Sequence, residues 1–86
     1  MNYTVVVFRS RNDTLKFYNI IKQSGQFCSI INTPRALSKS CGISVRISTS
    51  SINISQMILS RNSFSSFSGI YSIKILNGKE IASRIA

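Results

Sequence analysis

The segment Tyr3–Phe8 places the strongest constraint on the fold of this chain. It is a short run of mostly β-branched, apolar side chains near the start of the sequence. A strand with one wet face would alternate apolar and polar residues, whereas a continuous apolar run is typical of a strand buried on both faces. The segment therefore predicts a strand in the centre of a sheet.

The residues after this strand predict a helix that runs from about residue 12 to residue 24. Its apolar residues form a broad stripe, and Ser10, Asn12 and Asp13 each offer a side chain for the N-cap. Gly25 is placed to end the helix in a left-handed conformation. An amphipathic helix is thus expected to follow the first strand directly.

Three further segments predict strands. Residues 27–32 form an apolar run that ends at a Thr-Pro pair, because proline removes a donor from the strand ladder. Residues 43–48 alternate apolar and polar side chains, which predicts one buried face and one wet face, with Ser44 and Arg46 on the wet face. Residues 69–76 supply the last of these strands.

A second helix is predicted over residues 53–61, between the third and fourth strands. Ile54, Met57 and Ile58 recur there at helical spacing, and Met57 is interpreted as a residue that fills the core rather than as a ligand. The following segment, 62–68, is polar and rich in serine, which is typical of a loop.

The dipeptide Asn77-Gly78 predicts a hairpin that folds residues 79–85 back along the fourth strand. A short terminal helix or a frayed tail is the alternative for this segment. We expect one domain over residues 1–76, with residues 77–86 as an additional strand or tail. The order of elements predicts an α+β fold, a ferredoxin-like two-layer sandwich (βαββαβ) with an antiparallel sheet and both helices on one face.

The composition excludes several classes of function. No apolar run approaches the roughly 18 to 20 residues of a membrane span, so no membrane association is expected. Two cysteines without any histidine exclude a disulfide framework and a zinc site, and they fit a reducing cytoplasm. With only Asp13 and Glu80 as acids, general acid–base catalysis is not expected, and neither is a cofactor. The net charge of +9 suits an anionic partner.

Residues 33–42, TPRALSKSCG, are predicted to form the loop that carries the chemistry. Thr33 can cap a short turn, Pro34 can open it, and Gly42 can take the positive φ that ends it. Cys41 is the proposed reactive residue, and nearby cations or hydrogen-bond donors would favour its thiolate. The supporting residues proposed for it are Arg35, Ser38, Lys39, Ser40, Gly42 and Arg46.

A structural role is the alternative interpretation of Cys41, because free cysteines are commonly buried. Cys28 lies inside an apolar strand with no basic neighbour in sequence, and it is interpreted as structural.

The loop resembles that of the putative selenium/sulfur carrier protein-like family, a group of small bacterial proteins. The matching motifs are Thr33-Pro34-Arg35, Leu37-Ser38, Ser40-Cys41-Gly42 and the alternating strand that follows. The resemblance implies that Cys41 holds a persulfide or selenide in transit between a donor protein and an acceptor protein, with Arg35 as the charge partner. The serine-rich, basic second helix and the residues NGKEIASRIA after the last matching strand depart from the pattern.

Two other functions remain open at this stage. A basic ferredoxin-like sheet could bind nucleic acid, but the third strand, ISVRIS, has no aromatic residue. Tyr3, Phe8 and Tyr71 are the candidates for base stacking, and packing in the core or at the sheet edge is the favoured interpretation of all three. A non-catalytic regulatory or assembly module is the third possibility. It would use a sheet edge or the uncovered sheet face to form a dimer.

Overall fold

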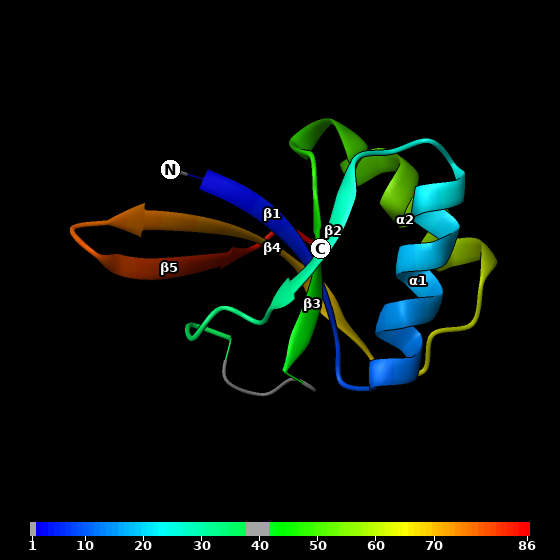
Figure 1. Cartoon of the computed structure of the whole chain (residues 1–86), viewed down its shortest axis with the longest axis horizontal. Helices are drawn as coiled ribbons and strands as arrows, with labels where there is room; N and C mark the ends of the chain where they lie inside the picture. Colours follow the sequence, from blue (N-terminus) through cyan, green and yellow to red (C-terminus); the bar gives the residue numbers. More distant parts are fainter. Residues whose placement is uncertain (1, 38–41) are drawn as a thin grey trace.

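The computed structural model describes residues 2–37 and 42–86. Over this part of the chain the fold is α+β, with a five-stranded antiparallel sheet and two helices in the order βαββαββ. The elements are β1 (Asn2–Phe8), α1 (Arg11–Gln23), β2 (Cys28–Asn32), β3 (Ile43–Ile47), the 3-10 helix η1 (Thr49–Ser51), α2 (Ile52–Arg61), β4 (Phe67–Leu76) and β5 (Lys79–Arg84). Both helices lie on one side of the sheet, and the other side carries no helix (Figure 1).

The strand β1 is central in the sheet, as predicted. The strand order is β2-β3-β1-β4-β5, and residues Thr4 to Phe8 are all buried. Successive residues of a strand point to opposite faces, so Val6 and Phe8 enter the main core under the helices. Val5 and Val7 enter a second apolar cluster on the helix-free face.

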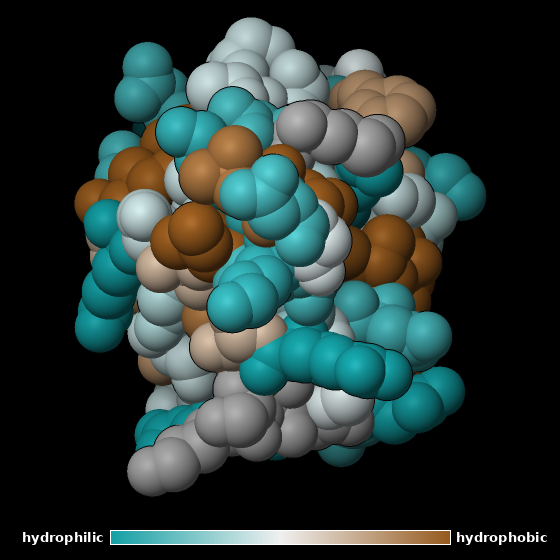
Figure 2. Space-filling model, turned by 90° about the vertical axis from the view of Figure 1, so that its left-hand side faces the viewer, coloured by the Kyte–Doolittle hydropathy of each residue, from teal (hydrophilic) through white to brown (hydrophobic). Residues whose placement is uncertain are grey.

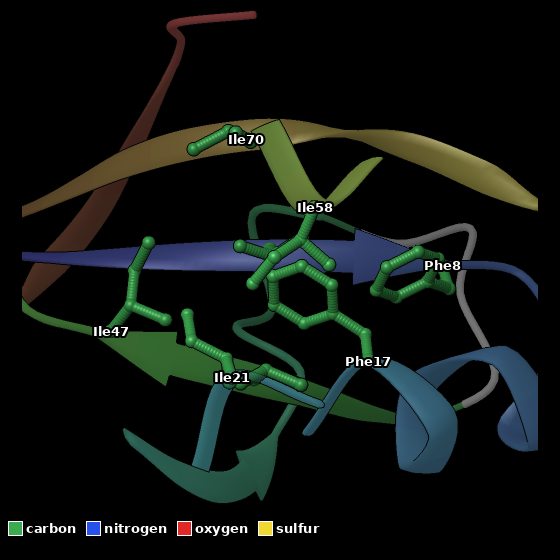
Figure 3. Packing of buried hydrophobic residues seen from close by; sticks show 8 residues of the cluster. Phe8, Phe17, Ile21, Ile47, Ile58 and Ile70 are labelled. Atoms are coloured by element: carbon green, nitrogen blue, oxygen red, sulfur yellow. The ribbon is translucent and has the colours of Figure 1, made fainter. Parts of the chain in front are cut away.

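The main core is built around aromatic rings. The ring of Phe8 lies 5.4 Å from that of Phe17 in α1 and 5.3 Å from that of Phe64 in the loop before β4, measured between centroids. Ile21 and Ile58 bring the two helices into the same cluster (Figure 3). Burying one such large apolar side chain stabilises a fold by about 1.5–3 kcal/mol.

Most local predictions for the two helices were right, and one was wrong. Ser10 is the N-cap of α1, and its hydroxyl accepts a hydrogen bond from the backbone N–H of Asp13 at 3.3 Å. In α2, Ile58 is buried as predicted. The interpretation of Met57 as a core residue was wrong, because α2 turns Ser55 and Ile58 toward the core and leaves Met57 43% exposed.

The Asn77-Gly78 turn forms the predicted hairpin. Asn77 has φ 52° and Gly78 has φ 76°, the positive values that a two-residue turn of type I′ requires. β5 then pairs with β4 from Leu76↔Lys79 to Tyr71↔Arg84. The alternatives for this segment, a terminal helix or a frayed tail, were therefore wrong.

No helix within residues 2–37 and 42–86 is long and apolar enough to cross a membrane. The sequence did not predict the short helix η1 or the start of β4 at Phe67.

The assignment of this α+β fold to the ferredoxin-like sandwich is finer than the element order alone, and it stays a prediction.

Candidate functional site

The candidate site is the segment between β2 and β3, residues 33–42, which we call the presenting loop. The structure describes residues 33–37 and Gly42 of it. The proposed sulfur-bearing residue Cys41 and three of its predicted supports, Ser38, Lys39 and Ser40, lie outside the described residues. The described part of the site consists of the two ends of the loop and of the residues that hold those ends.

The base of the presenting loop is closed by two contacts. The backbone N–H of Thr33 donates to the carbonyl of Gly42 at 2.9 Å, just beyond the last β2–β3 pair. The hydroxyls of Thr33 and Ser44 are 2.7 Å apart. Gly42 has φ 93°, the positive value predicted for it. Gly42 is the sequence neighbour of Cys41, so the residue next to the cysteine is fixed to the sheet.

The burial of Ser44 differs from the prediction. Ser44 was placed on the wet face of β3, yet it is fully buried. The alternation along β3 is correct, but the presenting loop folds back onto the helix-free face, and the Thr33 hydroxyl reaches Ser44 there. The pattern of a strand gives the side on which a residue lies and cannot show that a loop covers that side.

The described half of the presenting loop packs on the helix-free face. Pro34 is buried, and its carbonyl accepts a hydrogen bond from the N–H of Leu37 at 2.9 Å, which makes a tight turn. Leu37 packs against the second apolar cluster, whose buried members are Val5, Val7 and Ile73. Figure 2 views the molecule from the side away from the helices, and hydrophobic and hydrophilic side chains are interleaved there.

The turn is also tied to the C-terminal strand β5. The backbone N–H of Arg35 donates to Glu80 Oε1 at 3.0 Å, and the Tyr3 hydroxyl donates to Glu80 Oε2 at 3.4 Å. One carboxylate thus joins the loop, the central strand and the edge strand. Glu80 was not predicted from the sequence as a site residue. The available signal was that Glu80 is one of two acids in a strongly basic chain.

Two predicted cations occupy different surroundings. The side chain of Arg35 is exposed, while the guanidinium of Arg46 lies 4.9 Å from the centroid of the Tyr3 ring. Burial raises the pKa of the Tyr3 phenol above 10.0, the negative charge and hydrogen bond of Glu80 raise it further, and Arg46 lowers it. Arg46 is therefore paired with an aromatic residue of β1, and its role as a support of Cys41 stays a prediction.

The second cysteine, Cys28, lies at the start of β2 and packs against the main core. Burial raises the pKa of its thiol, and Lys22 opposes this shift. Both observations agree with the interpretation of Cys28 as structural. Among the residues that the structure describes, no group of His, Cys, Asp and Glu side chains could hold a metal ion.

The three residues considered for base stacking lie in different places. Phe8 is fully buried in the main core, which confirms its interpretation as a packing residue and rules it out for base stacking. Tyr3 and Tyr71 pack on the second cluster, on the helix-free face. The ring of Tyr71 lies over Gly69, since a Cβ at that glycine would be 2.9 Å from Tyr71 Cε1.

The comparisons with known proteins agree with the loop motif. Neither the curated proteins nor the solved structures give a match. The family model described as "Putative Se/S carrier protein-like" matches residues 2–75, a span that includes the presenting loop and ends before β5. This description is that of a carrier rather than an enzyme. The chain therefore belongs to the "Putative Se/S carrier protein-like" family.

Proposed function

We propose that this protein carries sulfur or selenium on Cys41, as a persulfide or selenide in transit between a donor protein and an acceptor protein. The observation that carries the proposal is the family match across a loop with a single cysteine. Both described ends of this loop are fixed to the sheet by hydrogen bonds. The described residues on both sides of Cys41 are therefore held to the sheet.

The loading step needs no external oxidant or reductant. The Cys41 thiolate attacks the terminal sulfur of a donor persulfide, so a new S–S bond forms on Cys41. The S–S bond of the donor breaks at the same time, and the donor cysteine leaves as a thiolate. The terminal sulfur keeps its proton, and delivery to an acceptor thiolate repeats the exchange in the other direction.

The sequence around Cys41 supports a thiolate. Lys39 and Arg35 are cations within the same loop, Ser38 and Ser40 are hydroxyl donors, and the Arg35 side chain is exposed. Nearby cations lower a thiol pKa and so raise the thiolate fraction at neutral pH. We propose Arg35 as the charge partner of the Cys41 thiolate.

The proposal also includes a finer assignment of the fold. We infer a ferredoxin-like arrangement for β1 to β4, because β1 and β2 both pair antiparallel with β3 and are therefore parallel to each other, with α1 as their connection. β5 extends this arrangement at the β4 edge. A solved structure with a different strand order would refute the assignment.

Mass spectrometry tests the carrier function directly. The protein is incubated with a cysteine desulfurase and cysteine, and the adduct is mapped by peptide analysis without a reductant. We expect one added sulfur on Cys41 in the wild type and in the matched control Cys28→Ser, and none in Cys41→Ser. Loading of the Cys41→Ser variant, or loading of Cys28 alone, would contradict the proposal.

A further inference from the structure

We propose that Glu80 is a positioning residue of the carrier. Its carboxylate holds the described half of the presenting loop, residues 33–37, on the sheet, so that a protein donor meets the backbone of Arg35, the proposed charge partner of Cys41, at a constant position. This inference rests on the proposed function of Cys41. It adds a residue that the family match does not contain, because the match ends at residue 75.

The first support is the geometry of the carboxylate. Oε1 of Glu80 accepts the backbone N–H of Arg35 at 3.0 Å, in the middle of the described half of the loop. Oε2 accepts the hydroxyl of Tyr3 at 3.4 Å. The two oxygens therefore have separate partners, one in the loop and one in the central strand. An ionised carboxylate makes stronger hydrogen bonds than a neutral acceptor.

The second support is that Tyr3, the other partner of Glu80, is held in place by contacts of its own. The guanidinium of Arg46 lies over the Tyr3 ring at 4.9 Å, within the range of a cation–π contact. Tyr3 also packs against the second apolar cluster. Glu80 therefore links the loop to Tyr3, and Tyr3 is itself held against the sheet by its own contacts.

The third support is that an apolar contact holds the same half of the loop as Glu80. Leu37 packs against Val5, Val7 and Ile73, and its N–H is bonded to Pro34. The described half of the loop is thus attached at its base by Thr33, at its turn by Arg35 and beyond it by Leu37. Of these, the contact of Arg35 is the one made by a charged side chain from outside the β2–β3 segment.

A fixed loop matters more to a protein donor than to a small reagent. A small electrophile can reach a thiol in many loop conformations, whereas transfer between two proteins needs both sulfur atoms aligned at one place. Removing the Glu80 carboxylate should therefore slow persulfide transfer from a donor protein and leave alkylation by a small reagent nearly unchanged. This difference separates positioning from activation of the thiol.

The experiment uses the full chain with Cys28→Ser, so that Cys41 is the reactive thiol. Glu80→Ala, Glu80→Gln and the neighbouring control Lys79→Ala are compared by persulfide loading from a desulfurase and by iodoacetamide alkylation. We expect Glu80→Ala to load about tenfold more slowly, with an alkylation rate within about twofold of the parent. Glu80→Gln keeps an acceptor for the Arg35 N–H and should retain most of the loading rate, and Lys79→Ala should match the parent.

Several outcomes overturn the inference. Equal loading rates in Glu80→Ala and the parent would overturn it, and so would a parallel loss of loading, alkylation and thermal stability, which indicates damage to the fold. Hydrogen exchange of the Arg35 amide gives a readout that does not depend on sulfur. If the parent takes no sulfur, the proposed function fails, while faster exchange in Glu80→Ala still supports the positioning role and unchanged exchange overturns it.

Discussion

The two acidic residues of this protein each hold a different loop, and their surroundings differ. Asp13 accepts the N–H and the hydroxyl of Ser66, at 3.1 and 2.6 Å, and so fixes the segment before β4. Glu80 accepts the N–H of Arg35 at 3.0 Å and so fixes the presenting loop. Asp13 stands in the first turn of a helix, whereas Glu80 stands in the edge strand β5.

The two acids differ in how many neighbouring hydrogen bonds hold the same segment. Ser66 is also bonded to Arg9 and Ser10, through its carbonyl at 2.8 Å and its hydroxyl at 3.1 Å. The Asp13 contact is thus one part of a dense network at the start of α1. Among residues 2–37 and 42–86, the Glu80 carboxylate contacts Arg35 and Tyr3, and the contact with Tyr3 is long. We infer that the contacts of Asp13 with Ser66 serve stability, whereas the contact of Glu80 with Arg35 positions the described half of the presenting loop.

The largest expected effect is a loss of stability in Asp13→Ala. The variant removes the acceptor for both the N–H and the hydroxyl of Ser66. Losing hydrogen bonds to a charged group costs about 1.5 kcal/mol at a partly exposed site such as this, which lowers the midpoint of thermal unfolding by about 8 °C in a domain of this size. Circular dichroism during heating measures the change.

The matched control for this prediction is Glu80→Ala, which removes the only other carboxylate side chain. It should lower the midpoint by less than half as much, because its two contacts are more isolated. If Glu80→Ala proved the more damaging variant, the comparison between the two loops would be reversed.

The next largest effect is the loss of stability at acidic pH that the Asp13 carboxyl causes. The hydrogen bonds from Ser66 hold the pKa of this carboxyl below its ordinary value of 3.8. A lowered pKa in the folded state means that the stabilisation is present above pH 3.8 and is lost as the pH falls through the lower folded value. Urea unfolding of the wild type and Asp13→Ala should differ most near neutral pH and converge below pH 3.8. A constant difference across this range would contradict the assignment.

Local sequence patterns were sufficient for most of the fold. The apolar run Tyr3–Phe8 predicted the central strand, and Asn77-Gly78 predicted the hairpin, because both depend on neighbouring residues alone. The orientation of α2 was harder, since its buried residue Ser55 is polar and its exposed residue Met57 is apolar. Apolar periodicity detected this helix but could not orient it, because its core face contains the small hydroxyl side chain of Ser55.

The loop of the candidate site was predictable from the sequence, and the contacts that hold it were not. The Thr-Pro and Cys-Gly pairs marked residues 33–42 as a loop, and Gly42 has the predicted positive φ. The contact between Arg35 and Glu80 joins residues 45 positions apart, and that between Tyr3 and Glu80 joins residues 77 apart. Such pairs depend on how a loop folds over a sheet, and a single sequence carries no local signal for them.

A smaller effect is expected at the base of the presenting loop. Thr33→Val keeps the shape of the side chain and removes the hydroxyl that lies 2.7 Å from Ser44. Ser44 is fully buried, so its hydroxyl would lose a partner where water does not easily replace it. We expect a loss of about 1 kcal/mol in the free energy of unfolding, measured with urea. The control Ser48→Ala, at the other end of β3, should change stability by less.

The smallest effect concerns the phenol of Tyr3, and it tests whether Glu80 contacts the central strand in solution. Burial is the main cause that raises the pKa of Tyr3, and the negative charge of Glu80 adds to it. Glu80→Ala should therefore lower this pKa without returning it to 10.0, because the burial remains. Ultraviolet titration of the wild type and of Glu80→Ala, each compared with a version that carries Tyr3→Phe, isolates the Tyr3 signal from those of the other two tyrosines. If the pKa of Tyr3 were the same with and without Glu80, the carboxylate would not be within reach of β1. Glu80 would then still contact the Arg35 amide but would lack its second contact, on Tyr3, and the support that this contact gives to the positioning role would disappear.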